Sequence, residues 1–294
     1  MAFRTGFDLL RLQGDVLWAG GEFAAKIVSE PLLRMIVPKG DGKTPVMTLP
    51  GFTGPEFSLQ PLNQFLCSIG YVAQPWGLGT NRGIRDMDHM EAIASQLGDK
   101  LRKMADEHGR PVALIGQSLG GVFARELARR FPKDVDRVIT LGSPAHFGET
   151  DHEVNALVAR VMRFYTGRSV EEHLSEVNNG KFNISEPPPG VPLVSIYSVY
   201  DGVAHPATTK IPERFLNIEG DAPRENIEIV CSHCGMGVNP LVLIAIADRL
   251  AEKVKDWVPF DPLNYAAGPV RKVSRWFYPS RLKPRATTGA AAQA

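Results

Sequence analysis

Residues 112–127, with the sequence VALIGQSLGGVFAREL, join a strand pattern to a helix pattern through a sharp turn. The apolar residues 112–115 predict a buried strand, and the residues after the turn have helical spacing. Ser118 stands between the two patterns, with Gly116 two residues before it and Gly120 two residues after it. Small residues at these places relieve the crowding of the backbones, so the serine can project from the fold. The G-x-S-x-G pattern therefore predicts a nucleophilic serine at the end of a strand.

Strand and helix patterns alternate on both sides of this turn. Apolar runs that end in turn residues predict strands within 45–52, 72–81, 111–116, 135–144, 192–202 and 225–237. Helical periodicity is present over 58–71, 85–109, 120–132 and 239–257. This alternation predicts an α/β fold, with a mostly parallel central sheet and helices on both faces.

Three segments do not follow the alternation. Residues 1–37 predict one or two amphipathic helices, interrupted at Gly14, that pack on the domain surface or form a membrane-contacting arm. Residues 145–190 are interpreted as a helical cap inserted into the main domain, which spans 38–258. Residues 259–294 form a tail with six basic side chains around Trp276, Phe277 and Tyr278, and its last nine residues are predicted to be disordered.

The composition narrows the classes of function. Of the 294 residues, 44% are hydrophobic and 22% are charged, and the net charge is +1, which gives no reason to expect a nucleic-acid partner. Three cysteines give no disulfide framework and favour a reducing, cytoplasmic location. We find no signal peptide pattern and no apolar run long enough to span a membrane. The basic tail is compatible with peripheral membrane contact or with folding back on the domain.

Three motifs carry a resemblance to a known family. The stretches GQSLGG (116–121), TLPGFTGP (48–55) and TLGSPAHFG (140–148) resemble the α/β-hydrolase superfamily, in particular its bacterial lipase and esterase branch. The resemblance covers about residues 40–258 and implies the α/β-hydrolase fold. It also implies a catalytic triad whose members follow the chain order serine, acid, histidine.

The base of such a triad follows the last strand, and among the seven histidines His233 has that position. His146, in the GSPAHFG turn, is its main rival, and in lipase-like relatives a histidine at this place lines the site. For the acid, Asp201 follows the strand pattern of 192–202 directly, where the family places it. Asp221 and Glu228 are the alternative acids. A purely structural interpretation of Asp201 is that it forms an Asp-Gly turn.

The resemblance also implies an oxyanion hole. Leu119, the residue after the serine, supplies one backbone donor, and Phe52 supplies the second, with Thr53 as the alternative. Many bacterial lipases have His-Gly where this chain has Pro50-Gly51. This departure leaves a main-chain donor in place, but the side-chain contact by which the family's histidine fixes the loop is not implied here. We expect Thr53, His146 and, from the cap, Met162 to contact substrate.

The expected function is a serine hydrolase that cleaves carboxylic esters, with a small, lipid-like ester as its partner and no cofactor. Thioesterase, amidase and acyltransferase activities use the same triad and are alternatives. A non-catalytic lipid-binding or scaffold protein is an alternative of another class. The CSHC stretch at 231–234 resembles a metal pair, but a second pair is missing from the sequence, so we expect no metal.

Overall fold

The computed structural model describes residues 2–145, 163, 167, 186–265 and 277–279. In these residues one sheet is formed by six parallel strands in the order β2-β1-β3-β4-β5-β6. The strands are β1 (Pro45–Leu49), β2 (Val72–Pro75), β3 (Val112–Gln117), β4 (Val135–Leu141), β5 (Leu193–Tyr197) and β6 (Arg224–Glu228). The α/β architecture predicted from the alternating patterns is confirmed.

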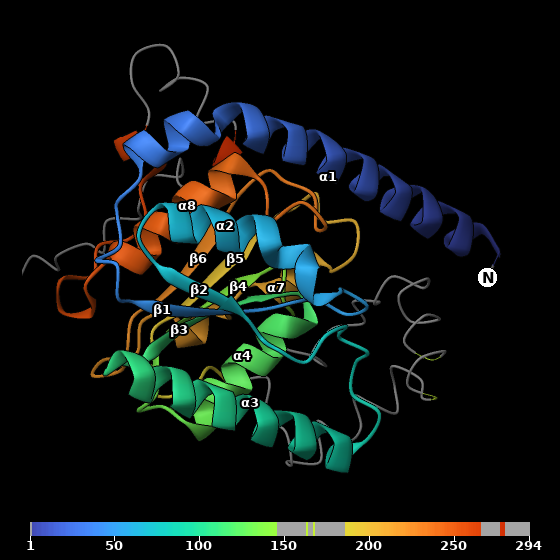
Figure 1. Ribbon diagram of the computed structural model, residues 1–294. Coiled ribbons are helices and arrows are strands. Elements are labelled where there is room, and N and C mark those ends of the chain that lie inside the picture. The colour runs from blue at the N-terminus through green and yellow to red at the C-terminus, as the bar shows by residue number, and fades with distance from the viewer. Residues whose placement is uncertain (1, 146–162, 164–166, 168–185, 266–276, 280–294) are drawn as a thin grey trace, which may run out of the picture.

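Helices cover both faces of the sheet (Figure 1). One face carries α2 (Gln60–Ser68) and α8 (Pro240–Ala251), and the other carries α3 (Met87–His108) and α4 (Leu119–Arg130). Because both faces are covered, every residue of β1 and β5 is buried, which explains their continuous apolar runs. Shorter elements are α7 (Pro206–Thr209) and the 3₁₀ turns Glu56–Leu59, Glu213–Phe215, Val254–Asp256 and Pro262–Tyr265.

The ends of the helices have local causes. Helix α3 begins after Asp86, whose side chain accepts the N–H of His89, and it ends at Gly109 in the left-handed conformation. Helix α8 ends at Ala251, six residues before the predicted limit at 257. Arg137 donates to the carbonyl of Glu252 just beyond that end, so a side chain from β4 satisfies a carbonyl that a longer helix would bond internally.

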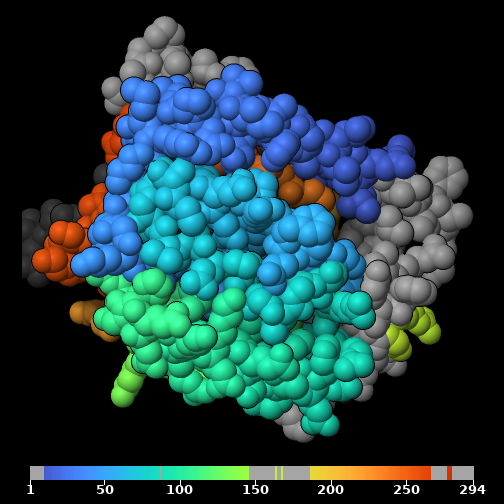
Figure 2. Space-filling model, viewed as in Figure 1, coloured from blue at the N-terminus to red at the C-terminus, as the bar shows by residue number. Residues whose placement is uncertain are grey.

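The N-terminal segment forms a single helix, α1 (Ala2–Ile36), which continues through Gly14. It lies along the outside of the molecule beside α8 (Figures 1 and 2). Over residues 10–36 its buried side chains are Asp15, Glu22, Lys26 and Leu33, three of which carry charges. Large apolar side chains are exposed on it instead, namely Leu10, Val16, Leu17, Phe23, Ile27, Val28, Leu32 and Met35. The helix is therefore amphipathic, but its charged side faces the protein.

Some expectations fall on residues that the structure does not describe. These are the helical cap between 146 and 185 except residues 163 and 167, His146 and Met162, and the tail at 266–276 and 280–294. Among the helices that are described, none combines the length and the apolar character needed to cross a bilayer.

Candidate active site

The carboxyl ends of the six parallel strands lie at one edge of the sheet, which is where α/β sheets place their ligands. Ser118 follows β3 directly, and Gly142 follows β4. Asp201 lies in the loop after β5, and His233 lies in the loop after β6. The topology thus gathers at one edge residues that are up to 115 positions apart in the chain.

Ser118 occupies a strained turn between β3 and α4. Its φ is 50° and its ψ is −123°, a conformation that non-glycine residues rarely adopt and that is found at functional turns. A Cβ on Gly116 would lie 2.4 Å from the backbone of Gly120, and a Cβ on Gly120 would lie 2.1 Å from the carbonyl oxygen of Leu49. The glycines are therefore required by close backbone approach on both sides of the serine, as the sequence pattern predicts.

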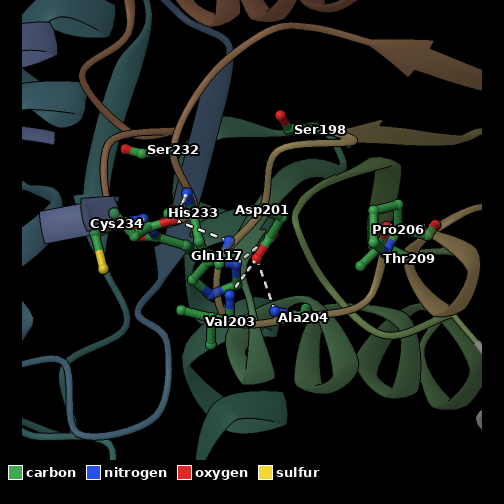
Figure 3. Close-up of polar contacts among 12 residues, drawn as sticks. Gln117, Ser198, Asp201, Val203, Ala204, Pro206, Thr209, Ser232, His233 and Cys234 are labelled. Carbon is green, nitrogen blue, oxygen red and sulfur yellow. Dashed lines mark hydrogen bonds and ion pairs between the residues drawn. The ribbon is translucent and has the colours of Figure 1, made fainter. Parts of the chain in front are cut away.

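The imidazole of His233 meets the carboxylate of Asp201. His233 Nδ1 lies 2.6 Å from Asp201 Oδ2, and both side chains are buried (Figure 3). A carboxylate only accepts hydrogen bonds, so Nδ1 carries the proton and Nε2 is left as the proton acceptor. The other oxygen, Oδ1 of Asp201, accepts the N–H groups of Val203 at 2.8 Å and Ala204 at 2.7 Å, which fixes the carboxylate.

The two alternative acids have other partners. Asp221 accepts the N–H of Gly190 at 2.9 Å and pairs with Arg224, while Glu228 accepts the hydroxyl of Tyr197 at 3.1 Å. Neither of these contacts involves the histidine loop. Asp201 is thus the acid that the structure brings to His233.

The surroundings of His233 change its basicity. Burial by itself would lower the pKa of His233, but the charge of Asp201, its hydrogen bond and the charge of Asp15 outweigh burial and raise the pKa above its usual value. An imidazole with this environment accepts a proton more readily than one in water.

Two further contacts hold the histidine in place. The side-chain amide of Gln117, the neighbour of Ser118, donates to the carbonyl oxygen of His233 at 2.9 Å (Figure 3). Gly142 has a φ of 56°, and a Cβ on it would lie 2.9 Å from His233 Nδ1 and 3.0 Å from Asp201 Oδ2. Only a residue without a side chain fits at this position beside the pair.

The loop after β1 is held by Asn81, which is almost fully buried. The amide of Asn81 donates to the carbonyl oxygen of Pro50 at 2.8 Å, and its backbone carbonyl accepts the N–H of Thr53 at 2.7 Å. The N–H of Thr53, the alternative oxyanion donor, therefore already donates to Asn81, which lies in the segment after β2. Leu119 is the first residue of α4, where helix N–H groups have no intrahelical acceptor.

Two other histidines in the described part of the chain have local hydrogen bonds. His205 caps α7, and the ring of His89 accepts the N–H of Arg85. Burial raises the pKa of the Cys231 thiol well above its usual value and that of Cys234 to about 12. No cluster of three or more His, Cys, Asp or Glu side chains suited to a metal ion occurs in the described part of the chain.

Sequence reasoning missed three buried polar residues that contact this edge. Asn81 orders the loop after β1, and Asp15 and Glu22 of α1 contact the loop that contains His233. A signal for the last two was present, because acidic residues seven positions apart lie on one side of a helix. The prediction for this segment used only the spacing of its apolar residues, which lie on the other side of the helix.

Comparisons with known proteins bear on the fold of the chain. A model of the α/β-hydrolase fold family matches residues 89–174. The structure of Aspergillus fumigatus lipase B is similar, with a TM-score of 0.50 and 16% identity, covering 76% of this chain and 57% of that one. A lipase-esterase related protein from Clostridium acetobutylicum has a TM-score of 0.48 and 14% identity, covering 73% and 96% of the two chains.

Naproxen esterase from Bacillus subtilis gives a TM-score of 0.47 and 14% identity, covering 74% of this chain and 86% of that one. A search of curated proteins by sequence gave no match. The parallel sheet, the turn at Ser118 and the match over residues 89–174 together show that the chain has the α/β-hydrolase fold.

Proposed function

We propose that the protein is a serine hydrolase that cleaves carboxylic esters, with Ser118 as nucleophile, His233 as base and Asp201 as the orienting acid. The observation that carries the proposal is the 2.6 Å contact between His233 Nδ1 and Asp201 Oδ2, at the same sheet edge as the strained turn of Ser118. A non-catalytic protein has no need of a strained serine and a buried His–Asp pair at one edge.

In the proposed reaction, Ser118 Oγ attacks the ester carbonyl carbon while His233 Nε2 takes the hydroxyl proton. Asp201 stabilises the imidazolium, and the N–H groups of Leu119 and Phe52 donate to the oxyanion. The intermediate collapses, the C–O bond breaks, and the alcohol leaves with the proton from His233. Water then attacks the acyl-enzyme by the same steps, which releases the acid and restores Ser118.

The substrate proposed is a small, lipid-like ester. Substrate contacts by Thr53, His146 and Met162 stay predictions, as do a membrane contact through the basic tail and a cytoplasmic location. Thioesterase and acyltransferase reactions remain alternatives because they proceed through the same acyl-enzyme.

The test is hydrolysis of p-nitrophenyl esters from acetate to palmitate by the wild type, Ser118→Ala and the control Ser68→Ala. Ser68 is an exposed serine at the end of α2, whose hydroxyl donates to the carbonyl of Phe65. We expect Ser118→Ala to lose about 10⁴-fold or more in kcat and Ser68→Ala to keep wild-type turnover. Equal activity of the wild type and Ser118→Ala would refute the mechanism.

A fluorophosphonate probe separates the alternatives. Labelling of the wild type but not of Ser118→Ala, without hydrolysis of any ester, would favour a thioester or acyl-transfer substrate. Absence of labelling in both proteins would favour the lipid-binding or scaffold alternative.

A further inference from the structure

Helix α1 contacts the proposed catalytic loops with its charged side. Asp15 and Glu22 are only 4% and 5% exposed, whereas most of the large apolar side chains described on the same helix face solvent and Leu33 is buried. Trp18 adds a ring contact with Tyr200, the residue before Asp201, at a centroid distance of 6.0 Å. Beside the loops of His233 and Asp201 the contacts of α1 are therefore largely polar, while Leu33 packs in the core further along the helix.

Asp15 joins the two loops that hold His233 and Asp201. Its Oδ2 accepts the N–H of His233 at 2.8 Å and the N–H of Gly202 at 3.1 Å. Its Oδ1 accepts the N–H of Cys234 at 2.8 Å. One carboxylate thus bonds to the backbone of the histidine itself and to the backbone next to Asp201, from a position 218 residues away in the chain.

Glu22 holds the other side of the histidine loop. Its Oε1 accepts the N–H of Ser232 at 3.0 Å and the side-chain amide of Asn239 at 2.8 Å, and its Oε2 accepts the Ser232 hydroxyl. Asn239 also caps the start of α8, so Glu22 links the loop to a helix of the domain. Burial raises the pKa of Glu22, and the bonds from Ser232 and Asn239 oppose this rise.

Two glycines leave room for these carboxylates. A Cβ on Gly235 would lie 1.7 Å from Glu22 Oε2. A Cβ on Gly202 would lie 2.9 Å from the carbonyl oxygen of Arg11 and 3.1 Å from the Cβ of Asp15. Each of the two loops thus lacks a side chain at the place where α1 approaches most closely, an observation independent of the hydrogen bonds.

We propose that Asp15 and Glu22 are positioning residues that hold the loops of His233 and Asp201 in the relative position that catalysis requires. This inference rests on the proposed function, since it assigns their effect to the proposed base. The physical reason is that charge-assisted bonds to backbone N–H groups are directional and strong in a buried setting, so they fix the loop more firmly than packing alone.

The charge of Asp15 has a second effect. The charged groups that face His233 are Asp201 from the loop after β5 and Asp15 from α1, and both raise the pKa of His233 against the effect of burial. Glu22 contacts Ser232, the neighbour of His233 in the chain. The thiols of Cys231 and Cys234 have raised pKa values and stay neutral near pH 7. Loss of the negative charge of Asp15 should therefore lower the pKa of His233.

The test compares Asp15→Asn and Glu22→Gln with the control Glu30→Gln in the full chain. All three changes remove one negative charge from α1, but the Glu30 carboxylate contacts Lys26 and Arg34, each at 2.6 Å, and not the histidine loop. The first readout is kcat and KM for the best p-nitrophenyl ester. The second is the pH titration of the His233 imidazole by NMR, whose signal is assigned by its loss in the His233→Asn variant.

We expect Asp15→Asn to lower kcat by about 10²-fold with little change in KM, and to lower the pKa of His233. Glu22→Gln, which keeps one acceptor oxygen, should lower kcat less, and Glu30→Gln should match the wild type. A folded Asp15→Asn protein with wild-type kcat and an unchanged His233 titration would overturn the proposal. If Asp15→Asn does not fold, Gly202→Ala keeps the carboxylate and displaces it, and wild-type values in that variant would overturn the proposal equally.

The two proposals can fail separately. A wild type without Ser118-dependent hydrolysis would refute the proposed function. The titration of His233 would still test the contact with Asp15, because it requires no turnover.

Discussion

Gly142→Ala tests the His233–Asp201 pair from a position that takes no part in the chemistry. The new Cβ would lie 2.9 Å from His233 Nδ1 and 3.0 Å from Asp201 Oδ2. Ordinary contacts of carbon with heavy atoms begin at about 3.5 Å, so the pair must move by about 0.5 Å. A displacement of this size at a reacting group should lower kcat by about 10- to 10²-fold, which is about 1.4–2.7 kcal/mol of barrier.

The substitution also has a conformational cost, because Gly142 has a φ of 56°. An alanine in the left-handed region costs about 1–2 kcal/mol of stability. Gly220→Ala is the matched control: its φ is 79°, and a Cβ on it would have no neighbour within 4 Å. It should show the conformational part of this loss of stability in urea unfolding, without the steric part, and its kcat should be unchanged.

The assay is therefore kcat for the best p-nitrophenyl ester in three proteins, the wild type, Gly142→Ala and Gly220→Ala, with urea unfolding of each. Equal kcat values for the two alanine variants would refute the reasoning that the His233–Asp201 geometry controls turnover. A lower kcat in Gly220→Ala would instead show that loss of stability alone reduces activity, and would remove the basis of the comparison.

Three further predictions follow from single contacts. His233 must be neutral to accept a proton, and its pKa is raised above the ordinary value. The value of kcat/KM should therefore fall towards low pH, with an inflection above about pH 6.5. An inflection below this pH would contradict the environment assigned to His233. Asn81→Ala should destabilise the fold by about 1–3 kcal/mol and lower kcat, since it removes the donor to the Pro50 carbonyl; wild-type kcat would show that the loop orders itself. Asp86→Ala should cost about 1 kcal/mol in urea unfolding by loss of the α3 cap, while the exposed neighbour Asp88→Ala should cost less; equal losses would argue against capping.

The elements of the fold could be predicted from local sequence. Strands β1, β3 and β5 are buried on both faces, so their apolar runs stand out from the surrounding chain. The turn at Ser118 was predictable for a similar reason, because the glycines required by its backbone are within two residues of it. The order of Ser118, Asp201 and His233 came from the resemblance, and the chain alone left Asp221 and Glu228 open as acids.

The tertiary structure decided the contacts that no local pattern contains. Only the folded chain brings Asp201 within 2.6 Å of His233 and the Asn81 amide to the Pro50 carbonyl. The orientation of α1 also could not be predicted from the sequence. The periodicity of a helix shows that it has two different sides, but not which side faces the protein. Here buried N–H groups of the histidine loop needed acceptors, and Asp15 and Glu22 supply them from more than 200 residues away. The hydrogen-bond requirements of a distant loop, together with the packing of Leu33 in the core, therefore determined which side of the N-terminal helix faces the domain.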